Sequence, residues 1–212
     1  MNRLRRTLFA PCAALCFTLA LAQSAQARPD GDFKAEAARF LASHETQLQQ
    51  ADKPNHRLHL LLNLTPAAMY AGDAGKATAY ATELMALGEK LKTFPGFGPG
   101  LYGNATHVGN LVLGRLALLG GDVSKAKEHL LAAGRVPGSS TLMSFGPNML
   151  LASELIERGE RDAAVQYLDL CAKFWERQDG KIEGWKGVIR EGGMPNFGAN
   201  LNYALLNWRF AE

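Results

Sequence analysis

The amino-acid sequence predicts an all-α fold in which helix pairs stack into an α-α superhelix. Three observations predict it. Beyond residue 28, apolar residues recur at the three- and four-residue spacing of amphipathic helices. No stretch alternates apolar and polar residues for long enough to predict a strand. A pattern that begins with glycine recurs at three places along the chain.

The first predicted element after residue 28 is an amphipathic helix over about 32–50. Its apolar residues recur at helical spacing, and they are Phe33, Ala37, Phe40, Leu41 and Leu48. The predicted domain therefore begins with an N-terminal helix that precedes the repeated part.

Three ten-residue stretches align without gaps, and they cover residues 72–81, 121–130 and 159–168. Each has a glycine, then an acidic residue, and then an alanine four positions beyond the acid. This pattern indicates a helix that ends at the glycine, a tight turn, and an acid near the positive end of the next helix. The small alanine lets the second helix of a pair lie close to the first.

The segments before the glycines also correspond, with Leu64-Thr65, Leu113-Gly114 and Leu151-Ala152 in matching places. The middle copy resembles the tetratricopeptide repeat, through Leu113, Gly114, Ala117, Gly121, Ala126, Leu130, Ala133 and Pro137. The resemblance covers about residues 56–176, but successive glycines are 49 and 38 residues apart, whereas the family's repeat has about 34 residues. It implies about three helix pairs, over about 56–92, 104–134 and 146–176. A generic paired-helix solenoid is the alternative.

Similar aromatic–glycine segments precede the predicted helices, at residues 94–104, 144–148 and 196–200. An aromatic ring followed by glycine suits a helix start, where the ring packs as a staple. We expect residues 198–210 to form the first helix of an incomplete fourth pair, and Lys181–Arg190 to form a short packing helix. Together they make a C-terminal cap over about 181–210. Six aromatic residues are expected to close this end of the array, with a cage for a sugar or peptide as the alternative: Phe174, Trp175, Trp185, Tyr203, Trp208 and Phe210.

The N-terminal 27 residues have the three parts of a secretory signal peptide. These are a basic region with Arg3, Arg5 and Arg6, an apolar run from Leu8 to Ala22, and the small residues of Ala25-Gln26-Ala27. A retained membrane anchor is the alternative, but the run is shorter than the ~20 apolar residues that span a bilayer. We therefore expect cleavage before Arg28, a single domain over 28–212, and a periplasmic or secreted location.

The mature chain is balanced in charge. The whole sequence has 23 basic and 20 acidic residues, and the signal peptide holds three arginines and no acid, which leaves 20 of each. This balance predicts no nucleic-acid partner, because such binding depends on many cationic phosphate contacts. It also predicts no stable membrane attachment after cleavage. Cys171 is then the single cysteine, and its place in the repeat predicts a packed small side chain.

In the tetratricopeptide family the concave surface comes mainly from the first helix of each pair, and peptides are its usual ligands. The resemblance therefore points to amides that can donate to and accept from an extended backbone, namely Asn63, Asn110, Asn148 and Asn200. Phe97 and Tyr102 of the first aromatic–glycine segment complete the predicted binding residues. The alternative is that Asn104, Asn148 and Asn200 are helix-start residues, since asparagine favours caps.

The patterns typical of catalytic, metal and cofactor sites are missing from the sequence. His56 and His59 lie three residues apart, but no third ligand is near them in the sequence, so we interpret them as solvent-facing. The chain has no G-x-S-x-G elbow, and the glycines of residues 96–103 lack the following lysine of a P-loop. We therefore expect no catalytic residue, no metal site and no cofactor.

These observations favour an exported binding or scaffold module that contacts a protein or a peptide. The rival is a small-molecule-binding protein, or an accessory subunit of an enzyme, with a pocket shaped by the aromatic–glycine loops. Homotypic assembly is a third alternative. Convergence of Phe97, Tyr102, Phe145 and Phe197 on a deep polar pocket would favour the rival, and their separate burial would favour the scaffold.

The exported product should begin at Arg28, because the basic region, the apolar run and the Ala25-Gln26-Ala27 site occur in the order that signal peptidase requires. N-terminal sequencing of the protein from the periplasm or the medium measures this directly. Recovery of a chain that still starts at Met1 in the membrane fraction would contradict it.

Overall fold

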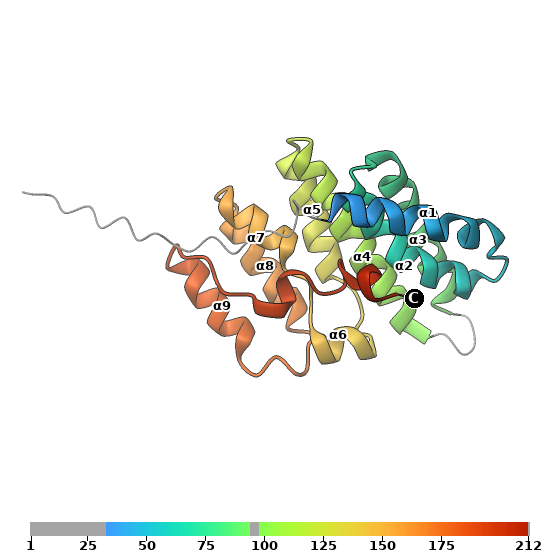
Figure 1. The fold of residues 1–212 in the computed structure, drawn as a ribbon. Helices are drawn as coiled ribbons and strands as arrows, with labels where there is room; N and C mark the ends of the chain where they lie inside the picture. The colour runs from blue at the N-terminus through green and yellow to red at the C-terminus, as the bar shows by residue number, and fades with distance from the viewer. Residues whose placement is uncertain (1–32, 94–97, 212) are drawn as a thin grey trace, which may run out of the picture.

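A computed structural model describes residues 33–93 and 98–211 of the chain (Figure 1). The described residues form an all-α fold, and none of them belongs to a strand. The predicted signal peptide and Phe97 lie outside these residues. The fold begins with α1 (Lys34–Gln50), α2 (Pro54–Ala71), α3 (Ala74–Leu91), α4 (Gly98–Leu119) and α5 (Val123–Gly134). It continues with α6 (Ser140–Phe145), α7 (Leu150–Glu157), α8 (Arg161–Cys171), α9 (Lys181–Arg190) and the 3-10 turns η1 (Gly198–Leu201) and η2 (Asn207–Phe210).

From α1 to α5 and from α7 to α9, helices that follow one another in the chain pack side by side, which fits a superhelical arrangement. The pairs α2/α3, α4/α5 and α7/α8 fall where the sequence predicts them, with α1 packed on α2. Between the second and third pairs, α5 contacts both α7 and α8. The helix predicted over Lys181–Arg190 has those bounds in the structure and packs on α8.

The three repeated turns have one geometry. Gly72, Gly121 and Gly159 have φ angles of +83°, +85° and +87°, which is the left-handed region that favours glycine. In each turn the glycine N–H donates to the carbonyl three residues back, and the N–H of the following acid donates to the carbonyl five residues back. These bonds satisfy carbonyls that the helix end would leave unpaired. The predicted helix–turn–helix pattern is confirmed.

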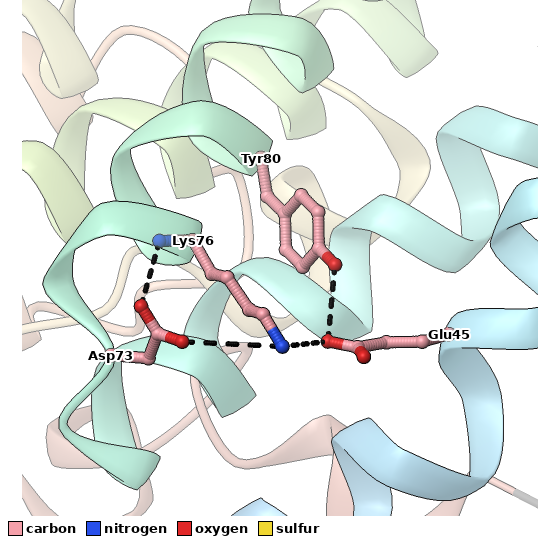
Figure 2. A network of polar contacts seen from close by, with 4 residues as sticks. All are labelled: Glu45, Asp73, Lys76 and Tyr80. Atoms are coloured by element: carbon pink, nitrogen blue, oxygen red, sulfur yellow. Dashed lines mark hydrogen bonds and ion pairs between the residues drawn. The ribbon is translucent and has the colours of Figure 1, made fainter.

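The acid of the turn caps the second helix in two of the three copies. Asp73 and Asp122 each accept a hydrogen bond of 2.9 Å from the N–H three residues on, whereas Glu160 makes no such bond. Figure 2 shows that the Asp73 cap belongs to a larger network, in which Lys76 pairs with Glu45 of α1 and the Tyr80 hydroxyl donates to the same carboxylate. This network joins α1 to the second helix of the first pair.

The repeated alanines are buried in the array, and the Ala126 backbone lies close to Gly114 of the partner helix. Ala77, Ala126 and Ala164 are all 0% exposed. Opposite Ala126, a Cβ atom added to Gly114 would lie 3.3 Å from the Ala126 carbonyl oxygen and 2.5 Å from a Leu151 methyl. Neither residue can therefore grow without moving its neighbours. Cys171 is also fully buried, as its place in the repeat predicts.

The sequence misses the start of α4, which begins at Gly98 rather than near residue 104. Its glycine-rich first turns are helical because of a close contact. A Cβ atom on Gly103 would lie 2.5 Å from the carbonyl oxygen of Pro137. Packing against the 137–139 segment outweighs the low helix propensity of glycine here. That segment leads into α6, a short helix that the sequence does not predict and that Ser139 caps through the N–H of Leu142.

The prediction of a helix over residues 198–210 is wrong. After α9 the chain turns at Gly192, which has a φ of +86°, and then forms only the two 3-10 turns η1 and η2. Its backbone groups find partners outside a helix, since the Met149 N–H donates to the carbonyl of Asn200 at 2.8 Å. Ala204 takes a φ of +62°, which also interrupts helical geometry.

The six C-terminal aromatic residues do not form one closing set. The rings of Trp175 and Trp185 are tilted by 34° with centroids 5.6 Å apart, and Trp185 meets Phe197 edge-on at 5.1 Å, at the α8–α9 end of the array. Trp208 instead packs at the other end, 5.7 Å from the ring of Phe40 in α1. The C-terminal segment therefore reaches both ends of the superhelix.

Ala126→Leu should lower the free energy of unfolding by about 1–3 kcal/mol, because the larger side chain overpacks the α4–α5 contact at Gly114. Ala79→Leu is the matched control, since Ala79 is exposed on α3. Chemical denaturation of both variants measures the difference. Equal stability of Ala126→Leu and the control would contradict the close packing of this helix pair.

Candidate functional site

The residues after α9 return across the first helices of the three pairs. We call residues 194–211 the C-terminal segment, and the side of α2, α4 and α7 that it covers the first-helix face. In Figure 1 the segment runs from α9, through η1, to a last turn beside α2. Its η1 turn contacts α7, and its η2 turn contacts both α1 and α2. The face that the resemblance assigns to ligands is thus covered by the chain's own C-terminal segment.

Asn148, which lies just before α7, holds this segment by its backbone. The Asn148 side-chain amide donates to the carbonyls of Leu201 at 3.1 Å and Tyr203 at 2.6 Å. Its side-chain oxygen accepts the N–H of Leu150 at 2.9 Å, so the same residue also caps α7. Asn148 is 0% exposed. Asn148 therefore has the helix-start role that the sequence offers as the alternative, and it also bonds two carbonyls of the C-terminal segment, at and just after the end of η1.

Asn200 makes the reverse contact from the segment to the array. Its amide donates to the carbonyls of Phe145 and Pro147, both at 2.9 Å. Its own carbonyl accepts from Met149. The two predicted residues Asn148 and Asn200 thus lie together, one on each side of the contact.

Trp208 anchors the far end of the segment. It is 1% exposed, and its ring lies 5.7 Å from Phe40 of α1 and 6.3 Å from Tyr70 of α2. The next residue, Arg209, pairs with Glu36 of α1 at 3.1 Å. Burial of a large aromatic ring supplies more stabilisation than the half-exposed ion pair beside it.

Between the segment and the array the chain leaves a pocket of about 320 Å³, which we call the amide pocket. The array contributes α2, α4 and α6, through His59, Leu62, Asn63, Leu101, Asn104, His107, Val108, Thr141 and Leu142. The C-terminal segment contributes Tyr203, Ala204 and Asn207. The volume falls at the lower end of the ~300–1,000 Å³ that is typical of small-ligand sites.

Polar and apolar side chains share the lining of the pocket, which contains no Asp, Glu, Lys or Arg. Asn104 accepts a hydrogen bond from the Ser139 hydroxyl at 2.7 Å. The amides of Asn63 and Asn207 make no hydrogen bond to another residue within the described part of the chain. Both side chains are therefore free to donate to and accept from a bound molecule.

His107 lines the pocket with an uncharged imidazole ring. Its Nδ1 donates to the Ala133 carbonyl at 2.9 Å, and its Nε2 accepts the N–H of Asn148 at 3.3 Å. Complete burial lowers the pKa of His107 to about 4. Partial burial raises the pKa of Tyr203, so its phenol stays protonated and can act as a donor.

A second cavity of about 150 Å³ adjoins the amide pocket, because His59 and Asn63 line both. His44 and His56 complete its three histidines. His44 is held by the Phe40 carbonyl at 2.9 Å and stacks on the Phe40 ring at 4.0 Å. Within the described residues, no group of three or more His, Cys, Asp or Glu side chains could hold a metal ion.

Two of the predicted binding residues lie away from this site. Asn110 is 7% exposed, donates to the Thr106 carbonyl and shares a hydrogen bond of 2.9 Å with His129. Its mid-helix amide is thus committed to internal contacts. Tyr102 is half-buried beneath the Lys92 ammonium, which lies 5.3 Å from the ring centre. Phe97, the remaining aromatic prediction, lies outside the described residues.

Phe145 and Phe197 of the aromatic–glycine segments do not line the pocket, although Leu101 and Asn104 of the first segment do. Phe145 is 62% exposed beside Tyr203, whereas Phe197 is 1% exposed beneath Trp185. The pocket is lined by amides and histidines instead, and of these the sequence predicts only Asn63. An amide-rich run at residues 200–207 is the one sequence signal for Asn207, but it does not indicate a return to α2.

No described helix is long and apolar enough to cross a membrane. Comparison of the chain with family models, with curated proteins and with solved structures gives no match. The site is therefore interpreted from its own geometry.

The stability of the fold should depend on pH through His107. Its folded pKa of about 4 lies below the ordinary 6.5, so between these values the unfolded chain binds more protons. Its contribution to stability is complete above pH 6.5 and is lost as the pH falls toward 4, by up to ~3 kcal/mol in all. Denaturant titrations of the wild type and of His107→Gln measure this.

The glutamine variant should lose that part of the pH dependence, because a glutamine keeps a donor and an acceptor but does not titrate. His129, whose pKa is also lowered by partial burial, remains in both proteins and serves as the internal reference. Parallel curves for the two proteins between pH 6.5 and 4 would exclude this role for His107.

Proposed function

We propose that this chain is a non-catalytic binding module whose first-helix face takes a polypeptide segment through its main-chain carbonyls. The observation that carries the proposal is the pair of hydrogen bonds from Asn148 to the main-chain carbonyls of Leu201 and Tyr203. Such contacts depend on the shape of the backbone, since they touch no side chain of the bound segment. The face thus already has the chemistry of peptide recognition.

The C-terminal segment is the model for the partner. It combines a backbone contact at Asn200 with an aromatic anchor at Trp208, which fills the space between α1 and α2. A partner of this kind is a peptide that forms short 3-10 turns and carries an amide and, eight residues later, a large aromatic side chain. We place this binding in the periplasm or outside the cell, on the strength of the N-terminal signal pattern.

The attached segment is a strong competitor for any partner. A tethered ligand has an effective concentration in the millimolar range, without any new contact. A partner in solution therefore competes for the first-helix face only when the contacts that hold the C-terminal segment are weakened. A second copy of the chain competes on equal chemical terms, because its own segment has the same sequence, and exchange of segments would give homotypic assembly.

Loosening the segment tests the proposal. A labelled synthetic peptide of residues 196–211 should bind the Trp208→Ala protein at least about tenfold more tightly than the wild type. The variant lacks the anchor, so its own segment competes less well for the face. Fluorescence anisotropy of the peptide measures the two affinities, and circular dichroism checks that the variant keeps its helices.

Two control peptides make the result specific without changing the protein further. One carries Asn200→Ala and the other carries Trp208→Ala, and each should bind the variant protein more weakly than the natural sequence. If a folded Trp208→Ala protein binds all three peptides alike, or binds none of them, the first-helix face is not a peptide site and the proposed function is wrong.

A further inference from the structure

The amide pocket is a separate feature from the peptide contact. Asn148, Asn200 and Trp208 hold the segment, and none of them lines the pocket. The pocket instead lies between these two attachment points, with α2, α4 and α6 on one side and residues 203–207 on the other. A ligand can therefore occupy it while the segment stays in place.

The lining selects against charged molecules. It has no acidic or basic side chain apart from two histidines, and burial keeps His107 neutral at ordinary pH. A carboxylate or an ammonium that entered this space would lose solvating water and find no opposite charge. The ligand class that fits is therefore uncharged.

The same lining favours a molecule that both donates and accepts hydrogen bonds. The amides of Asn63 and Asn207 each offer a carbonyl and an NH₂ group and lack partners among the described residues. The Tyr203 phenol and the Thr141 hydroxyl add two more groups on opposite walls. Between these polar positions lie the apolar side chains of Leu62, Leu101, Val108 and Leu142.

A pyranose ring has this distribution of chemistry. Its hydroxyl groups form a rim that both donates and accepts, and its C–H faces are apolar. We propose that the amide pocket binds a neutral pyranose sugar, with Asn63 of α2 and Asn207 of the C-terminal segment as the hydrogen-bonding pair across the ring. Tyr203 and the leucines cover the faces of the sugar.

Direct titration of the full mature protein with monosaccharides tests this inference. The neutral probes are glucose, galactose, mannose and N-acetylglucosamine, and the charged probes of matched ring are glucuronate and glucosamine. Saturation-transfer NMR and calorimetry should detect the binding of at least one neutral sugar, with a dissociation constant in the millimolar range or below. The matched charged sugars should bind about tenfold more weakly, because each would bury an unpaired charge.

Substitution at Asn63 links that binding to the pocket. Asn63→Leu keeps the side-chain volume but removes the amide, so it should lower the affinity for the neutral sugar by about tenfold. Asn55→Leu is the matched control on the same helix, about 12 Å away along its axis, and it should leave the affinity unchanged. Asn207 is an exposed residue at the edge of the pocket, so Asn207→Leu gives a second test if Asn63→Leu does not fold.

Three results would overturn the proposal: no neutral sugar binds, charged sugars bind as well as neutral ones, or the affinity survives the loss of either amide. None of these readouts uses the labelled peptide or the Trp208→Ala protein. A failure here therefore leaves the peptide proposal standing, and a failure there leaves this one standing.

Discussion

Asn148 uses every hydrogen-bonding group it has, and it does so with no exposure to solvent. Its backbone N–H donates to His107 of α4, and its backbone carbonyl accepts from the hydroxyl of Tyr167 in α8. Its side chain caps α7 and holds the C-terminal segment. One residue thus joins the second pair, the third pair and the segment that crosses them. A buried polar group without a partner is costly. Loss of any one of these parts would leave a buried polar group of Asn148 without its hydrogen bond, so the parts stabilise one another.

The contact between Asn148 and His107 requires a neutral histidine ring. His107 is fully buried. One of its ring nitrogens donates to the carbonyl of Ala133, and the other accepts from the N–H of Asn148. A protonated ring would have two donors and would place a donor against the N–H of Asn148. Desolvation lowers the pKa of His107. The neutral ring that results is also the form that its two hydrogen bonds require.

The repeated part of the fold could be predicted from the sequence because its determinants are local. A glycine with positive φ, the acid after it and the alanine four residues beyond specify each turn without help from distant residues. The C-terminal segment could not be predicted in this way. Its form depends on Asn148 and on Phe40, which are far from it in the sequence, so the local aromatic–glycine pattern suggests a helix where the structure has 3-10 turns.

The candidate site shows the same division. The search for amides that can bind main-chain groups selects Asn148 and Asn200, and these two residues lie at one contact in the fold, although the backbone that Asn148 binds forms turns and is not extended. It also selects Asn110, because nothing in the sequence distinguishes an amide on a helix face from one that satisfies Thr106 and His129 internally. The amide pocket is missed except for Asn63, since Tyr203 and Asn207 reach it only through the return of the segment.

That shared wall ties the two proposed activities to each other. Tyr203, Ala204 and Asn207 line the pocket, and Trp208, the next residue, anchors the segment between α1 and α2. A partner that displaced the segment would remove one side of the pocket, so it would also weaken the site for a sugar. Thermodynamic linkage then requires the converse by the same factor: a molecule bound in the pocket holds the segment in place and opposes the partner. The sign of this coupling follows from the topology alone, because the segment is a wall of one site and the occupant of the other.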